Sequence, residues 1–149
     1  MSTALPHAVL FACTQNAIRS PIAEGYLKRL HGSRIYVDSV GVRGAEVDPF
    51  AIEVMRELGI DIGRHRAKTF DTLADTSFDV VVTLSPEAHH RALELTRVMA
   101  CDVEYWQIFD PTIIEGAREA RLAAYRDVRD TLIRRIQARF PGVPAPAGA

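Results

Sequence analysis

The chain has 149 residues and a formal net charge of −1, and 48% of its residues are hydrophobic, which is the composition of one globular domain. Its scattered Lys and Arg residues give no indication of a nucleic-acid partner. Two cysteines without a zinc or disulfide spacing predict no metal and no cofactor, and they favour a reducing, cytoplasmic compartment. We expect no signal peptide and no membrane association, because no apolar segment is long enough.

The first predicted strand covers residues 9–12, a run of four apolar side chains typical of a strand that is buried on both faces. Cys13 follows it directly, and Arg19 lies six residues further along the chain. Ser20 and Pro21 then predict the start of a helix, with Ser20 as the N-cap and Pro21 at the first helical position.

The rest of the chain alternates between strand and helix patterns. Apolar runs predict strands at residues 35–40, 78–84 and 102–108. Apolar residues at intervals of three and four predict helices at residues 20–32, 49–59, 85–98 and 115–140. In the second and the last of these helices, the side chains expected to face inward are Ile52, Met55, Leu58, Leu122, Tyr125, Val128, Leu132 and Ile136.

This alternation predicts an α/β fold, a three-layer sandwich in which helices cover both faces of a central four-stranded parallel sheet. The expected limits are one domain at residues 7–140 and flexible tails at 1–6 and 141–149. Ligands of such sheets bind beyond the carboxyl ends of the strands. The loops at Cys13, after Ser39 and at Asp110 should therefore meet at one edge of the sheet.

The loop between Cys13 and the first helix has the features of an anion site. Backbone N–H groups of a loop between a strand and a helix N-terminus can converge on a phosphate-sized oxyanion. The positive field there favours the thiolate form of Cys13, which is the nucleophilic form. Arg19 can donate two hydrogen bonds to the oxyanion.

The segment from Cys13 to Pro21, followed by Ala23 and Glu24, resembles the signature loop of the low-molecular-weight protein tyrosine phosphatases, a superfamily that also contains arsenate reductases. The resemblance extends over nearly the whole chain. The further matching segments are residues 37–39, 59–61, 65–67, 83–84 and the Asp-Pro pair 110–111.

The resemblance implies a role for each matching residue. Cys13 would accept the phosphoryl group, Arg19 would bind it, and Asp110 would act as general acid and then activate water against the phosphocysteine. The substrate would be bound by the loop residues Thr14, Gln15, Asn16, Ala17, Ile18, Arg19 and Ser20. A supporting hydrogen-bond network would comprise Asn16, Ser20, Ser39 and His65, in which Ser20 could donate to the sulfur of Cys13.

The sequence departs from this family at the loop and at the rim of the expected pocket. Gln15 stands where the family usually has Gly, and Ile18 replaces a second loop cysteine, so a protective disulfide with Cys13 is excluded. After the Asp-Pro pair the chain has Thr112, Ile113 and Ile114, where phosphotyrosine-specific members have aromatic residues. These departures count against phosphotyrosine as the substrate.

The function predicted from these residues is a cysteine-dependent phosphomonoester hydrolase that acts on a phosphorylated protein or a small phosphoester. A homodimer is left open. The first alternative is an arsenate reductase that uses an external thiol, because residues 85–99 contain no cysteine and Cys101 alone cannot supply a thiol relay. The second is a non-enzymatic oxyanion- or phosphoprotein-binding module, although such a module would not need Cys13 or Asp110.

Three remaining candidates are expected to be structural. Cys101 precedes a strand and is predicted to be a buried thiol. His89 and His90 are predicted to lie on a solvated helix face, because adjacent residues of a helix point in different directions. Trp106 is expected to pack in the sheet rather than to reach the pocket.

Overall fold

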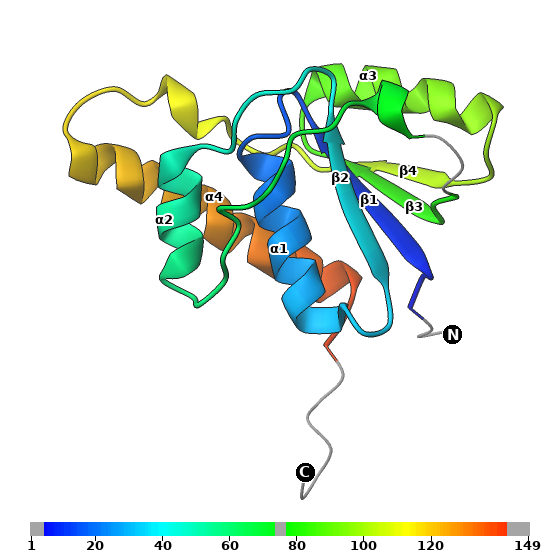
Figure 1. Ribbon diagram of the computed structural model, residues 1–149, viewed down its shortest axis with the longest axis horizontal. Coiled ribbons are helices and arrows are strands. Elements are labelled where there is room, and N and C mark those ends of the chain that lie inside the picture. Colours follow the sequence, from blue (N-terminus) through cyan, green and yellow to red (C-terminus); the bar gives the residue numbers. More distant parts are fainter. Residues whose placement is uncertain (1–4, 74–76, 143–149) are drawn as a thin grey trace, which may run out of the picture.

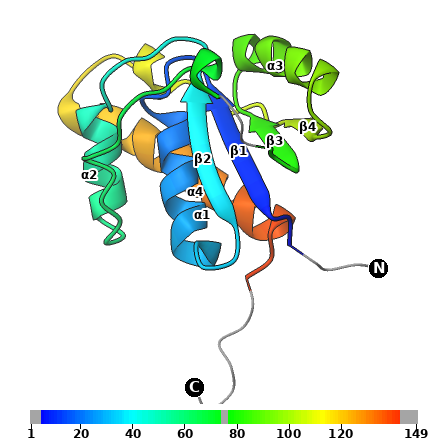
Figure 2. The same ribbon diagram turned by 45° about the vertical axis from the view of Figure 1, so that its right-hand side comes forward.

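The computed structural model describes residues 5–73 and 77–142, and it contains a four-stranded parallel sheet in the order β2-β1-β3-β4. Helices cover both faces of this sheet (Figures 1 and 2), which confirms the predicted three-layer α/β sandwich. The strands are β1 (Ala8–Cys13), β2 (Tyr36–Gly41), β3 (Val80–Thr83) and β4 (Asp102–Tyr105). The helices are α1 (Arg19–His31), α2 (Pro49–Arg56), α3 (Pro86–Leu93) and α4 (Arg118–Arg139).

The two central strands are buried along their whole length because both of their faces are covered. Alternate residues of β1 enter different cores. Val9 and Phe11 pack in the cluster that includes residues of α1, α2 and α4, whereas Leu10 and Ala12 pack in the cluster that includes residues of α3. Because both faces of β1 are packed against helices, every position of the strand is apolar, as the sequence predicted.

The register of the sheet brings the ends of the strands to one edge. Cys13 is the partner of Gly41 at the end of β2, and Ala12 is the partner of Thr83 at the end of β3. A side chain at position 41 would collide with the loop after β1, because its Cβ would lie 2.6 Å from the backbone nitrogen of Asn16. A glycine at this position therefore allows β2 to end directly against that loop.

The start of α1 differs from the prediction. The N-cap is Ile18, which makes no side-chain capping bond, and Ser20 and Pro21 lie within the first turn. Ser20 does not cap the helix because its hydroxyl contacts the Cys13 sulfur and the Asn16 amide instead. The predicted capping role was therefore wrong, although the helix itself was expected.

Helix α2 is capped by Asp48, whose Oδ1 accepts a hydrogen bond of 2.8 Å from the backbone N–H of Phe50. The helix ends at Arg56, so Leu58 lies beyond it and is 39% exposed, contrary to the prediction. Ala51, Val54 and Met55 are the buried residues of this helix.

Several other elements are shorter than predicted, and strand β3 covers only Val80–Thr83 of the expected residues 78–84. Helix α3 ends at Leu93 and continues only as a 3₁₀ turn over Glu94–Arg97. Strand β4 ends at Tyr105 because its partner β3 ends at Thr83. Helix α4 begins at Arg118, since Gly116 has a φ of 117° that a right-handed helix does not contain. The inward stripe predicted for α4 is confirmed: Leu122, Tyr125, Val128, Leu132 and Ile136 are all buried.

Within the described residues, no helix is both long and apolar enough to cross a bilayer. The predicted flexible tails fall largely outside the described residues. Of the C-terminal tail, residues 141–142 are described. Pro141 contacts α1, because its carbonyl oxygen lies 3.0 Å from His31 Nε2.

Candidate active site

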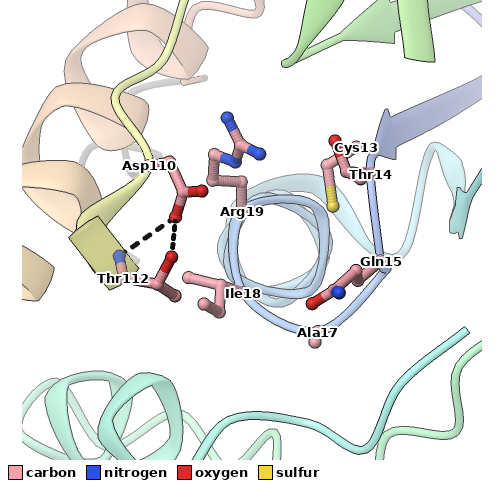
Figure 3. Close-up of a pocket in the computed structure, with 8 residues that line it drawn as sticks. All are labelled: Cys13, Thr14, Gln15, Ala17, Ile18, Arg19, Asp110 and Thr112. Atoms are coloured by element: carbon pink, nitrogen blue, oxygen red, sulfur yellow. Dashed lines mark hydrogen bonds between the residues drawn. The ribbon is translucent and has the colours of Figure 1, made fainter. Parts of the chain in front are cut away.

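A cavity of about 160 Å³ opens at the carboxyl edge of the sheet. Its lining residues are Cys13, Thr14, Gln15, Ala17, Ile18, Arg19, Asp110 and Thr112 (Figure 3). Asp110 and Thr112 lie on one side of the cavity, and Cys13 and Gln15 lie on the other (Figure 3). The structure therefore brings the predicted nucleophile, arginine and acid together around one space. Thr112, one of the residues expected at the rim in place of an aromatic side chain, also lines it.

Cys13 is the last residue of β1 and is only 2% exposed. Its sulfur lies 2.9 Å from the hydroxyl oxygen of Ser20. The fold holds the two residues together because the loop returns from the end of β1 to the first turn of α1.

Asn16 is the centre of the network behind the loop. It is fully buried and has a φ of 54°, the left-handed region. Its Nδ2 donates to Ser20 Oγ at 2.8 Å and to Ser39 Oγ at 2.9 Å. Its Oδ1 accepts from the backbone N–H of Lys68 at 2.9 Å and lies 2.9 Å from His65 Nε2. Asn16 thus joins the loop to β2 and to the segment after α2.

Glu24 also belongs to this network, although no separate role was predicted for it from the sequence. Ser39 Oγ donates to Glu24 Oε1 at 2.5 Å. The hydroxyl oxygens of both serines accept a hydrogen bond from the Asn16 amide, and the Ser39 hydroxyl donates to Glu24. The Ser20 hydroxyl can therefore donate to the Cys13 sulfur. The carbonyl oxygen of Val40 is a more distant acceptor at 3.4 Å. The signal for Glu24 was its place one helical turn after Ser20.

We expect Asn16→Ala to lower the free energy of unfolding by about 2–4 kcal/mol, because it leaves several buried partners unsatisfied and strains a left-handed residue. Asn16→Gly relieves the backbone strain and should be about 1 kcal/mol less destabilising than Asn16→Ala. Urea unfolding of the two variants separates the side-chain and backbone contributions. Equal destabilisation by both variants would contradict the proposed strain at this position.

His65 supports the loop from the other side. Its Nε2 lies 3.1 Å from the carbonyl oxygen of Asn16, and its Nδ1 lies 3.7 Å from Glu24 Oε1. Burial lowers the pKa of His65, and the Lys68 ammonium lowers it further, against the opposing effect of Glu24. His65 therefore stays neutral more readily in the folded than in the unfolded chain.

This shift makes stability depend on pH. Above about pH 6.5 His65 is neutral in both states, and its full contribution to stability is present. As the pH falls, the unfolded chain takes up a proton before the folded chain does, so stability decreases until the pH passes the folded pKa. We expect His65→Gln to lose less stability than the wild type between pH 7.5 and 5 in urea unfolding. The exposed His90→Gln is the control, and equal losses in the wild type and His65→Gln would contradict this assignment.

The Arg19 guanidinium is held by two backbone carbonyl groups, one after β3 and one after β4. Its Nη1 donates to the carbonyl oxygens of Ile108 at 3.0 Å and Leu84 at 3.3 Å. These bonds use one nitrogen of the guanidinium, and the others remain available to an anion in the cavity.

Asp110 is fixed through one of its two oxygens. Its Oδ1 accepts from the backbone N–H of Thr112 at 3.0 Å and from the Thr112 hydroxyl at 2.7 Å (Figure 3). A proton on this carboxyl group would therefore be carried by Oδ2.

Three other polar or aromatic candidates lie away from the cavity. His89 Nδ1 lies 2.9 Å from Thr83 Oγ1, and the centres of the His89 and Tyr105 rings are 5.2 Å apart. His89 is therefore half-buried, whereas the sequence predicted a solvated position. Trp106 is buried and does not line the cavity, as expected. Cys101 is half-buried rather than buried, and burial raises the pKa of its thiol. Among the described residues, no group of three or more His, Cys, Asp or Glu side chains is placed to bind a metal ion.

A parallel sheet whose first strand ends in a Cys-containing loop around a small cavity defines the class of phosphatase-like α/β proteins with a phosphate-binding loop. The family model described as low molecular weight phosphotyrosine protein phosphatase matches residues 8–138. The chain belongs to this family, as the resemblance implied.

The chain is similar to enzymes named as arsenate reductases. It is 34% identical to the arsenate reductase of Halalkalibacterium halodurans (strain ATCC BAA-125 / DSM 18197 / FERM 7344 / JCM 9153 / C-125) over 131 residues, which cover 87% of this chain and 91% of that protein. A solved structure of an arsenate reductase in the oxidized state has a TM-score of 0.74 and 30% identity, and covers 88% of this chain and 94% of its own. Another, in the phosphate binding state, has a TM-score of 0.70 and 29% identity, with coverages of 90% and 96%.

Proposed function

We propose that this protein is an arsenate reductase that obtains electrons from an external low-molecular-weight thiol. The observation that carries this proposal is the cavity, where Cys13 and Arg19 surround a small space whose lining contains no aromatic side chain. Such a space suits an inorganic tetrahedral oxyanion better than an aryl phosphoester. The similarity to proteins named as arsenate reductases supports the same choice over the phosphatase expected from the sequence.

In the first step the Cys13 thiolate attacks arsenic and forms an S–As bond. The loop N–H groups and Arg19 hold the remaining oxygens as their charge is redistributed. Asp110 gives the proton on its Oδ2 to the oxygen that departs, which leaves as water. The product of this step is a Cys13–arsenate adduct in which arsenic is still in the +5 state.

The second step needs a thiol from outside the chain. Strand register places Asp102 level with Val80 and Val80 level with Val9, so Cys101 lies at the amino edge of the sheet, whereas Cys13 lies at its carboxyl edge. The two are about 16 Å apart along the strand direction, whereas a disulfide needs Cα atoms within about 7 Å. Cys101 therefore cannot reduce the adduct.

We infer that an external thiolate attacks the Cys13 sulfur. An S–S bond forms, the S–As bond breaks, and its electron pair stays with arsenic, which leaves as arsenite. A second thiol then attacks the mixed disulfide, which releases the oxidised thiol as a disulfide and returns Cys13 as a thiol. In total, two thiols are oxidised for each arsenate reduced.

The test is arsenate-dependent oxidation of glutathione by the purified protein, with arsenite measured in parallel. We expect two thiols consumed per arsenite formed, and we expect Cys101→Ser to be as active as the wild type. Loss of activity in Cys101→Ser would contradict the external-thiol mechanism. Absence of arsenite with any thiol would contradict the proposed function.

A second candidate is the phosphomonoester hydrolase predicted from the sequence. The position of Asp110 at the cavity favours it, because the same Oδ2 proton could serve an ester leaving group. Hydrolysis of para-nitrophenyl phosphate by the same preparation, without arsenite production from arsenate, would favour this candidate.

A further inference from the structure

A second, larger cavity of about 910 Å³ lies beside the active-site loop. Its walls are the segments at residues 44–47 and 63–67, with Ile52 between them. The first segment is bonded to the active-site loop, since the backbone N–H of Ala45 donates to the carbonyl oxygen of Gln15 at 3.1 Å. Figure 3 shows chain segments passing beside the active-site loop on the side of Ala17. One peptide segment therefore separates this cavity from the loop that holds Cys13.

The charges of this cavity are predominantly positive. Arg64 and Arg66 both line it and are exposed, and no described carboxylate lies within ion-pair distance of either. Glu46 is the one acidic residue in the lining. Because burial lowers the pKa of His65, its ring adds no charge to this cavity near neutral pH. The cavity therefore offers two guanidinium groups and one carboxylate.

We propose that this arginine cavity, defined by Arg64, Arg66 and Glu46, binds the charged part of the low-molecular-weight thiol that reduces the Cys13 adduct. The proposal rests on the reductase function proposed above. Cysteine and its small peptides, such as glutathione, carry carboxylates, which the forked guanidinium groups bind well, and an amino group, which suits Glu46.

The length of such a thiol is compatible with binding in the arginine cavity and reaction at Cys13. Adjacent bonded chain segments lie about 5 Å apart, and an extended peptide spans about 3.3 Å per residue. A thiol of two or three residues, about 7–10 Å long when extended, can therefore hold one carboxylate at Arg64 or Arg66 while its sulfur extends past the 44–47 segment toward the active-site loop. The mixed disulfide then forms as described, without a further reactant.

The kinetic test uses the double variant Arg64→Gln/Arg66→Gln and two thiols of different charge. With glutathione, which carries carboxylates, we expect the KM for the thiol to rise about tenfold or more. With β-mercaptoethanol, which is neutral, and for arsenate itself, we expect no change in KM. The control is Arg134→Gln on α4, an exposed arginine away from both cavities. Equal KM values for glutathione in the wild type and the double variant would overturn the proposal and leave the reductase function intact.

A binding measurement separates the cavity from the activity. S-methylglutathione, which cannot reduce anything, is titrated into Cys13→Ser while backbone amide signals are followed by NMR. We expect shifts at residues 44–47 and 63–67 that disappear in the double arginine variant. No shifts, or tighter binding of a Glu-rich peptide than of S-methylglutathione, would overturn the proposal, the latter in favour of an acidic protein partner. If the wild type reduces no arsenate with any thiol, the proposed function fails. The NMR shifts still decide whether the arginine cavity binds S-methylglutathione.

Discussion

Cys13→Ser is expected to abolish arsenate-dependent thiol oxidation, with a loss of at least about 10⁴-fold. The serine hydroxyl is not ionised at neutral pH and forms no arsenic–sulfur bond, so neither the adduct nor the mixed disulfide can arise. The variant should still bind phosphate, because Arg19 and the loop N–H groups that surround the anion are unchanged. The measurements are arsenite production and phosphate binding by calorimetry.

The outcome distinguishes covalent chemistry from simple binding. Loss of turnover with retained phosphate binding assigns the chemistry to the Cys13 sulfur. Turnover that survives in a preparation free of wild-type protein would contradict the covalent mechanism. Loss of both turnover and phosphate binding would indicate that the loop has changed shape, and Cys13→Ala then serves as the second variant.

Asp110→Asn is expected to reduce turnover about 10²- to 10⁴-fold. The amide keeps the size of the side chain and can still accept from Thr112 through its oxygen, but it cannot supply the proton that Oδ2 carries. The departing oxygen of arsenate would then leave without protonation, which raises the barrier of the first step. Single-turnover formation of the Cys13 adduct measures this step directly.

The matched control is Asp127→Asn, which removes an exposed carboxylate from α4. It should leave turnover unchanged. With phosphoesters, the loss caused by Asp110→Asn should be small for para-nitrophenyl phosphate and larger for phenyl phosphate, whose leaving group is more basic. An equal effect on both esters would argue that Asp110 positions the substrate rather than donating a proton.

Local patterns predicted most of the secondary structure. The apolar run before Cys13 and the stripe from Leu122 to Ile136 each specify one element, because burial of a strand or of a helix face depends on spacing along the chain. The boundaries were less accurate. They depend on contacts that spacing does not contain, such as the loss of a strand partner after Thr83 or the positive φ of Gly116.

By itself, the sequence determined that Cys13 and Arg19 flank one short loop and that this loop lies between a strand and a helix. These facts follow from positions only six residues apart. The absence of a second cysteine near the loop, which would make a reductase depend on an external thiol, was also evident from the sequence.

Only the tertiary structure decided which distant side chains support that loop. Glu24 meets Ser39, and Asn16 meets His65 and the backbone of Lys68, because strand pairing and helix packing bring separate segments to one edge of the sheet. The arginines of the second cavity were visible in the sequence as part of a basic segment, but their position beside the active-site loop was not. Such contacts join residues far apart in the chain, and their geometry is set by the register of the whole sheet.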